Sequence, residues 1–241
     1  MATIIPNLTT TQIQALTTTL IGGLTTADWA AFSSSQIVAL TTSQMQAIST
    51  AGIAVLGTTA ISALETADLA MLISAQTRAL STNAIAALGT TQIAALTTTE
   101  SSSLSTAQLR AVGTTAISAI GTTALTALGS AQVVALTTTQ VGSLVTSQVV
   151  ALTTSQVSAL GTVQLGALGT TGIAAITSSQ ATALTTAQVA SLGTTSVAAL
   201  VTSNLSALVS GQVQALTTTQ LNALGTTQLV SLGTADRKSV V

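Results

Sequence analysis

The side chains that could do acid–base chemistry are few in this sequence of 241 residues. Glu65 and Asp68 are three residues apart, a spacing that could place two carboxylates on one helix face as an acid–base pair. Both replace residues of a repeat, so we interpret them as outward-facing substitutions. Arg78 and Arg110 fall at a variable position of that repeat and are predicted to face solvent. None of these residues is predicted to be catalytic.

Trp29 follows Asp28 in the sequence, and an indole beside a carboxylate could stack on a sugar. Trp29 stands where other repeats have Ile, Val or Leu, so we predict that it fills the core. Asp28 takes the place of a recurrent Gln. This pair is therefore also interpreted as structural.

The sequence lacks the residues that nucleophilic catalysis, metal binding or cofactor binding would require. Ser and Thr are abundant, but the chain has no histidine to serve as their base. It has no cysteine or tyrosine either, so Met1, Met45 and Met71 are the remaining candidates for haem ligation. No phosphate-binding glycine motif occurs. We predict no catalytic, cofactor-binding or metal site, no cofactor, and no enzymatic activity.

Charge and hydropathy limit the partners. Four basic residues and a formal net charge of −1 argue against binding to nucleic acid. The mean hydropathy is +0.72, yet hydroxyl residues interrupt every apolar run, so we predict no insertion into a membrane. The N-terminus lacks the basic region of a classical signal peptide.

An eight-residue repeat organises residues 9–232 into 28 consecutive octads without insertion or deletion. Position eight is a large apolar residue, position two is Ser or Thr in every octad, and position four is most often Gln. Position five is a large apolar residue in all octads except those with Thr77, Ser101 and Ala181. Position seven is mostly a small residue. We predict three segments: an N-terminal lead-in (1–8), a single solenoid (9–232), and a partial repeat with a tail (233–241).

A period of eight fits short helices better than one long element. In a strand, positions five and eight would face opposite sides of the sheet. In one continuous helix, eight residues overshoot two turns by about 80°, so the apolar stripe would wander around the axis. One helix of about one and a half turns per octad resolves both problems. The sequence predicts an all-α solenoid, with a β-solenoid rich in Thr and Val ladders as the alternative.

Two phasings of the helices are open. We favour Ser or Thr at position two as the N-cap, preceded by Gly at position one as the left-handed residue that ends the previous helix. The alternative places the cap at position one, with Gln at position four completing a capping box. Position one accepts apolar residues such as Ile73 and Val145, which favours the first phasing.

The runs L-T-T-T-Q-I-Q-A-L and A-L-G-T-T-Q-I-A-A-L resemble octapeptide-repeat proteins of proteobacteria, which are often labelled haem-utilisation or adhesion exoproteins. The resemblance covers essentially the whole chain. It implies a secreted or surface-displayed protein, of which this chain is a fragment. The last six residues, 236–241, depart from the repeat, and we interpret them as a non-native tail of translated adapter sequence from environmental reads.

The sequence predicts a structural or adhesive protein that forms an elongated rod or filament outside the cell, with self-association or a surface ligand as its interactions. The alternative is a ligand-binding Thr array, such as an ice-binding face, for which Thr10, Thr18 and Thr26 must point outward. Capping by position two would engage those hydroxyls and count against this alternative. A helical-repeat nucleic-acid binder, suggested by the likeness of L-T-x-x-Q-V-x-A-L to transcription-activator-like effector repeats, is disfavoured by repeat length and charge.

Overall fold

Every octad forms one short helix in the computed structural model, which describes the backbone of residues 3–238 and the side chains of residues 3–233. The described residues contain 28 α-helices, one 3-10 helix (η1) and no strand. The prediction of an all-α array with one helix per octad is therefore confirmed. The β-solenoid alternative is wrong for this part of the chain.

The chain divides into two units, one ending at Leu128 and one beginning at Gly129. The elements of the first unit are η1 (Ile5–Asn7), α1 (Thr10–Gln14), α2 (Thr18–Gly23), α3 (Thr26–Ala30), α4 (Ser34–Val38), α5 (Thr42–Ala47), α6 (Thr50–Val55), α7 (Thr58–Ala63), α8 (Thr66–Leu69), α9 (Ser74–Ala79), α10 (Thr82–Ala86), α11 (Thr90–Ala94), α12 (Thr98–Ser103), α13 (Thr106–Ala111), α14 (Thr114–Ile117) and α15 (Thr122–Thr126). Those of the second unit are α16 (Ser130–Ala135), α17 (Thr138–Gly142), α18 (Thr146–Ala151), α19 (Thr154–Ala159), α20 (Thr162–Ala167), α21 (Gly169–Ala175), α22 (Ser178–Ala183), α23 (Thr186–Ser191), α24 (Thr194–Ala199), α25 (Thr202–Ala207), α26 (Ser210–Gln214), α27 (Thr218–Asn222) and α28 (Thr226–Lys238).

Most helices begin at position two, because the residue at position one is the N-cap. Thr9 has extended φ and ψ angles of −73° and 161°. Its Oγ1 accepts the N–H of Gln12 at 3.3 Å, and its own N–H donates to Gln12 Oε1 at 2.8 Å. These reciprocal bonds are a capping box. The predicted N-cap at position two is therefore wrong, and the alternative phasing is correct.

Position one accepts apolar residues because the glutamine at position four accepts the backbone N–H of position one. This bond does not depend on the side chain at position one. The N–H of Ile73 donates to Gln76 Oε1 at 2.9 Å, and the N–H of Val145 donates to Gln148 Oε1 at 2.9 Å. Every residue except proline has this N–H. The tolerance of Ile and Val at position one is thus compatible with a cap there.

In most of the octads that have glycine at position one, this glycine is also the N-cap. Gly57 and Gly193 have φ angles of −71° and −65°, which any residue adopts. Gly169, with a φ of +64°, is the exception among the described residues. It follows α20 directly, where the left-handed conformation ends the helix. The predicted left-handed glycine corner is right at Gly169 and wrong at the other described position-one glycines.

The corner between octads is made by position eight instead. Leu56 has φ and ψ angles of −61° and 125°, and its N–H donates to the carbonyl of Ile53 at 3.2 Å. The chain leaves the helix in an extended conformation and enters the next N-cap. A left-handed residue is therefore unnecessary at most corners.

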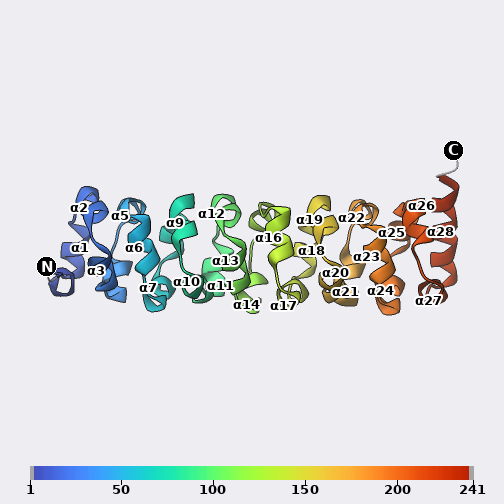
Figure 1. The fold of residues 1–241 in the computed structure, drawn as a ribbon, viewed down its shortest axis with the longest axis horizontal. Helices are drawn as coiled ribbons and strands as arrows, with labels where there is room; N and C mark the ends of the chain where they lie inside the picture. Colours follow the sequence, from blue (N-terminus) through green and yellow to red (C-terminus); the bar gives the residue numbers. More distant parts are fainter. Residues whose placement is uncertain (1–2, 239–241) are drawn as a thin grey trace. The chain divides into compact units, whose positions relative to one another are not determined.

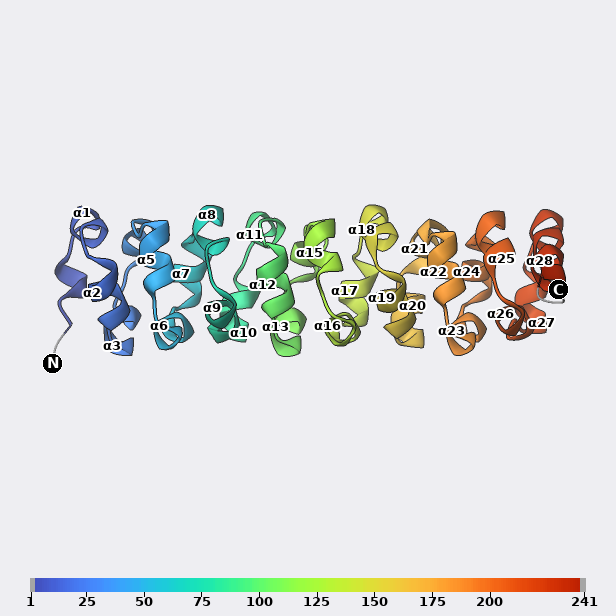
Figure 2. The ribbon, with the colours of Figure 1, turned by 90° about the horizontal axis from the view of Figure 1, so that it is seen from above.

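Stacking in both units follows one rule. Each helix packs against the helix three octads away, as α2 does on α5 and α19 on α22. The side chain of Gln44 in α5 also reaches the carbonyls at the end of α1, four octads back. A coil therefore holds between three and four octads. In Figure 1, α2, α5, α9 and α12 follow one another along one edge of the first unit, at intervals of three or four helices. Figure 2 shows the same alternation for α8, α11 and α15.

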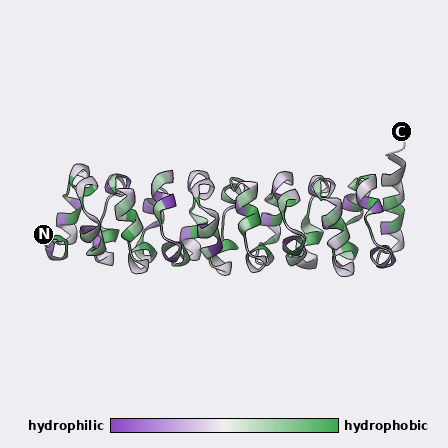
Figure 3. Cartoon of the chain, in the orientation of Figure 1, coloured by the Kyte–Doolittle hydropathy of each residue, from purple (hydrophilic) through white to green (hydrophobic). Residues whose placement is uncertain are grey.

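Positions five and eight form the core, as predicted. Position-five residues such as Ile37 and Val157 are fully buried, and position-eight residues such as Leu40 and Leu160 are 4% exposed. The three position-five exceptions, Thr77, Ser101 and Ala181, are buried as well. Figure 3 shows green, apolar segments in all the coils of each unit. Positions one to three are mostly exposed, so the Thr and Ser residues cover the surface.

The two ends of the array depart from the octad rule. Ile5 and Leu8 in the lead-in accept hydrogen bonds from Gln36 Nε2 at 2.8 Å each, as the end of a preceding helix would. At the other end, α28 runs for 13 residues and continues through residues 236–238 of the predicted tail. The remainder of that tail, residues 239–241, lies outside the described residues. The segment boundaries proposed from the sequence remain predictions.

No described helix has both the length and the apolar character that a membrane crossing requires.

Candidate functional site

Glutamine at position four joins one coil to the next. Gln108 is 2% exposed, and its Oε1 accepts the N–H of Ser105 at 2.8 Å. Its Nε2 donates to the carbonyls of Thr77 and Leu80, both at 2.8 Å. One amide therefore accepts the N–H at the start of its own helix and gives a further donor to carbonyls at the end of an earlier one.

The same arrangement recurs in both units, and we call these side chains the glutamine staples. In each staple Nε2 donates to main-chain carbonyls that lie 28 to 31 residues earlier. The staples include Gln36, Gln44, Gln76, Gln92, Gln108, Gln164, Gln180, Gln188, Gln212, Gln220 and Gln228. Sequence reasoning found the possible capping role of this glutamine but missed its role between coils. The signal was a long polar side chain next to the apolar position five.

Octads without glutamine show what the staple needs. Asn204 is one methylene shorter, yet its Nδ2 still donates to the carbonyl of Ile176 at 2.7 Å. At Gly52 the space is filled from another octad, because a Cβ there would lie 2.5 Å from Cδ1 of Trp29. A shorter amide can thus keep the contact with the preceding coil, and a glycine can give its space to a larger neighbour.

Glu100 completes only the capping half of a staple. Its Oε2 accepts the N–H of Thr97 at 2.7 Å. Its Oε1 is buried without a hydrogen-bond partner, and the residue is 1% exposed. Burial raises the pKa of the Glu100 carboxyl, and the hydrogen bonds from Thr97 act in the opposite direction.

Glu65 and Asp68 lie at the start of α8 in different environments. Glu65 is the exposed N-cap, as predicted, whereas Asp68 is 5% exposed. The prediction that Asp68 faces outward is wrong, because position four faces the preceding coil. Burial raises the pKa of Asp68, and the nearby charge of Glu65 raises it further. The interpretation of the two carboxylates as non-catalytic stays a prediction.

Asp28 and Trp29 both have structural partners. Asp28 Oδ2 accepts the N–H and the hydroxyl of Thr25 at 2.9 and 2.7 Å. Hydrogen bonds from Thr3 and Thr25 lower the pKa of Asp28. Trp29 is 1% exposed and stacks on Phe32, with 4.6 Å between ring centroids. The predicted core role of Trp29 is confirmed.

Arg78 and Arg110 are exposed at position six, as predicted. The Nε–H of Arg78 donates to the carbonyl of Ser103 at 3.4 Å. Among the described residues, no group of three or more His, Cys, Asp or Glu side chains could hold a metal ion.

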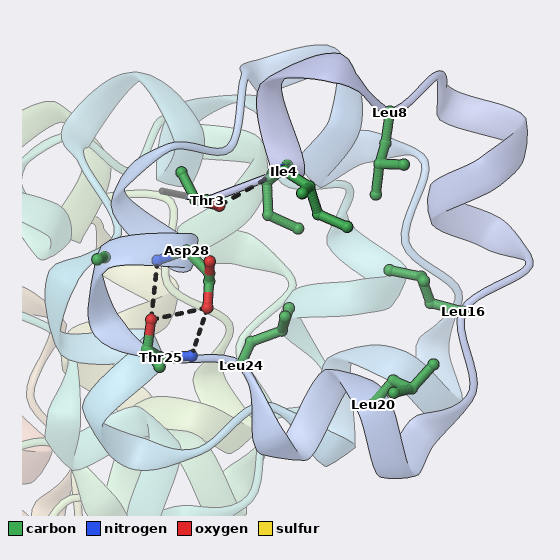
Figure 4. A pocket seen from close by; sticks show the side chains of 10 residues that line it. Thr3, Ile4, Leu8, Leu16, Leu20, Leu24, Thr25 and Asp28 are labelled. Atoms are coloured by element: carbon green, nitrogen blue, oxygen red, sulfur yellow. Dashed lines mark hydrogen bonds between the residues drawn. The ribbon is translucent and has the colours of Figure 1, made fainter. Parts of the chain in front are cut away.

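The N-terminal end of the first unit contains an open apolar pocket of about 590 Å³. Figure 4 shows side chains of Ile4, Leu8, Leu16 and Leu24 around this space, with Asp28 turned to Thr25 at its edge. Leu16 and Leu24 occupy position eight, Leu8 is the corresponding residue of the lead-in, and all three are half-buried. The pocket lies at the edge of the apolar core, and its lining offers shape and apolar surface.

Several residues at position two are exposed. Thr10, Thr18 and Thr26 are exposed at the first residue of their helices, and the caps are made by the preceding residues. Other hydroxyls at this position face the array, because Ser178 Oγ donates to Asn204 Oδ1 at 3.1 Å and Ser210 Oγ is buried. The exposed hydroxyls of Thr10, Thr18 and Thr26 are available for contacts outside the chain.

Comparison with known families gives one match. The family model of the ALTTAQ repeat matches residues 21–58, 61–98, 102–138, 133–162, 157–194 and 197–234. No significant match was found among curated proteins or among solved structures. The matched segments carry the same glutamine staples that join the coils in each unit.

Proposed function

Since the chain belongs to the ALTTAQ repeat family, we propose that it is a non-catalytic structural repeat protein in which the number of octads sets the length of an elongated array. The glutamine staple is the observation that carries this proposal. It commits the largest buried polar side chain of the repeat to the joint between coils. A joint of this kind can be repeated without limit, which suits a spacer or a filament.

We further propose that the surface acts in adhesion or self-association outside the cell. Positions one to three expose Thr and Ser, and only 4% of the residues are charged. A surface with so little charge offers weak electrostatic repulsion between copies. Lateral association of arrays, or binding to a neutral polar surface, is consistent with these properties.

Small-angle scattering and sedimentation velocity on the full chain test the structural proposal. We expect a maximum dimension far above that of a globular protein of 23.6 kDa, and a sedimentation coefficient distribution that shifts with concentration. A compact particle would contradict the elongated array. A concentration-independent monomer would contradict self-association and leave the spacer role in place.

A regular hydroxyl array that binds ice is the second candidate, and one observation favours it. Thr10, Thr18 and Thr26 are exposed and do not cap the helices, so the objection raised from the sequence falls away. The coil geometry opposes it, because a coil of between three and four octads turns equivalent hydroxyls away from a single flat row. A thermal-hysteresis assay decides the matter. Measurable hysteresis favours the ice-binding array, and its absence favours the structural role.

A further inference from the structure

Glu100 occupies a staple position with a side chain that has the length of glutamine but lacks its donor. The neighbouring staples show where its free oxygen lies. Gln92 Nε2 donates to the carbonyls of Ile61 and Leu64, which precede it by 31 and 28 residues. Gln108 uses carbonyls at the same two separations. The equivalent carbonyls for Glu100 belong to Leu69, the last residue of α8, and to Leu72, three residues later.

An ionised carboxylate is unsuitable at this place. The Oε2 atom of Glu100 already accepts the N–H of Thr97, which matches the role of Oε1 in glutamine. The buried, unpartnered Oε1 then corresponds to the Nε2 atom that donates in the flanking octads, and we infer that it faces the same carbonyls. A carboxylate oxygen and carbonyl oxygens are all acceptors and repel one another. Only a hydrogen on Oε1 turns this contact into a bond.

The surrounding charges do not compensate for ionisation. From α9, which packs on α12, the charged residue is Arg78, and its Nε–H points to the carbonyl of Ser103. From α15, which packs on the other side, no titratable residue is contributed. From α8 come Glu65 and Asp68, whose negative charges disfavour a further carboxylate.

We propose that Glu100 is a proton-binding site that locks α12 to α8. In the neutral form, the hydroxyl on Oε1 donates to the carbonyl of Leu69 or Leu72, while Oε2 accepts from Thr97. Loss of that proton to solvent places a carboxylate against carbonyl oxygens, and the joint between these two coils loosens. The other staples contain amides, which do not titrate, so this joint differs from them in its response to pH.

The direction of the response follows from the burial of Glu100. Burial raises the pKa of Glu100 in the folded array above its ordinary value of 4.5. The folded array therefore holds the proton more tightly than the unfolded chain. The contribution to stability is complete below pH 4.5 and is lost as the pH rises through the raised pKa. Each unit by which the folded pKa exceeds the unfolded value lowers the folding constant about tenfold at high pH.

Carbon-13 NMR of the full chain with glutamate labelled at the side-chain carboxyl is a direct test, because the chain has just two glutamates, Glu65 and Glu100. E100Q assigns the two resonances by removing one. We expect the Glu100 resonance to titrate above the ordinary glutamate pKa of 4.5. Titration of Glu100 at or below this value would overturn the proposal.

Urea unfolding of the wild type, E100Q and E65Q across pH 4 to 9 tests the joint itself. E100Q restores the consensus staple and should gain stability relative to wild type as the pH rises. E65Q removes an exposed carboxylate from the same region and should keep the wild-type loss of stability except for the part that the charge of Glu65 adds through Asp68. Asp68 contributes a loss in the same direction in all three proteins. An E100Q profile that runs parallel to wild type would refute the proton-dependent joint, and it does not bear on the structural role of the array.

Discussion

A primary amide at position four meets two opposite needs at once. The N-cap residue presents an N–H that lacks an intrahelical acceptor, and the end of an earlier helix presents carbonyls that can accept a further hydrogen bond. Gln180 supplies an acceptor at 2.7 Å to the N–H of Thr177 and a donor at 2.8 and 2.7 Å to the carbonyls of Val149 and Leu152. A carboxylate meets only the first need, and alanine meets neither. The frequency of glutamine at this position follows from that dual requirement.

Removing one staple should therefore cost far more than removing an exposed glutamine from the same helix. In α26, Gln212 accepts from the N–H of Val209 at 2.8 Å and donates to the carbonyls of Ala181 and Leu184 at 2.9 and 2.6 Å. Gln212→Ala should lower the free energy of unfolding by about 2–4 kcal/mol, because buried partners are left unsatisfied. Gln214→Ala, at an exposed position two residues later, should change it by less than about 0.5 kcal/mol. Equal losses in urea unfolding would show that the staple has no special role.

Trp29 and Gly52 depend on each other across one coil. A Cβ on Gly52 would lie 2.5 and 2.6 Å from Cδ1 and Nε1 of Trp29, which is fully enclosed. Gly52→Ala should therefore destabilise the first unit by about 1–3 kcal/mol through overpacking. Gly23→Ala is the control, because its Cβ would meet nothing within 4 Å and alanine favours a helix. In thermal unfolding, Trp29→Leu should reduce the cost of Gly52→Ala, and strictly additive losses would contradict the packing explanation.

At the scale of the element, the octad period made the helices and their buried positions predictable. Positions five and eight could be placed in the core because they are the two positions of the octad where large apolar residues recur, and a spacing of three puts them on one side of a helix. The helix start was placed one residue late. The tolerance of Ile73 at position one excludes a side-chain cap, but the acceptor comes from Gln76 and binds the backbone N–H. A sequence pattern shows which side chains a position prefers. It does not show which backbone N–H or carbonyl a side chain from another position hydrogen-bonds.

At Gly169 the helix ends in the left-handed glycine that the sequence predicts for the corners. Its φ of +64° would strain any residue with a Cβ. Gly169→Ala should destabilise the second unit by about 1–2 kcal/mol, and Gly169→Asn by less, because asparagine tolerates this conformation. Gly193→Ala, with a φ of −65° at the same octad position, should change stability by less than about 0.5 kcal/mol, because the lost cap preference and the reduced freedom of the unfolded chain oppose each other. Thermal unfolding of the three variants makes the comparison, and a Gly193→Ala loss equal to that of Gly169→Ala would remove the conformational explanation.

At the scale of the whole molecule, the number of octads in a coil could not be obtained from the sequence. All octads share nearly the same apolar pattern, so the pattern does not indicate which octads pack against each other. The partners are set by the geometry of the corner and by the reach of the staple, which connects residues 28 to 31 apart. The candidate site was missed for the same reason. A glutamine at position four has the same appearance in the sequence whether it faces solvent or the preceding coil.

A repeat that is joined at this fixed separation should tolerate the loss of a whole octad and not the loss of half of one. Deletion of residues 177–184 removes α22, and it brings Gln188 to the separation at which Gln180 now reaches the carbonyls of Val149 and Leu152. The following octads keep their phase, so the shortened chain should unfold cooperatively, with helicity per residue close to that of the parent. Deletion of residues 177–180 removes half as many residues but includes Gln180 itself. It also brings Gln188 and Asn204 four residues closer to the carbonyls of Val157, Leu160 and Ile176, which they reach across the deleted segment, so these contacts lose their separation of 28 to 31 residues. We expect circular dichroism to show a larger loss of helix for the half-octad deletion than for the full-octad deletion, together with a broader urea transition. Equal helicity per residue in the two deletions would mean that local helix propensity, rather than coil-to-coil register, holds the array together.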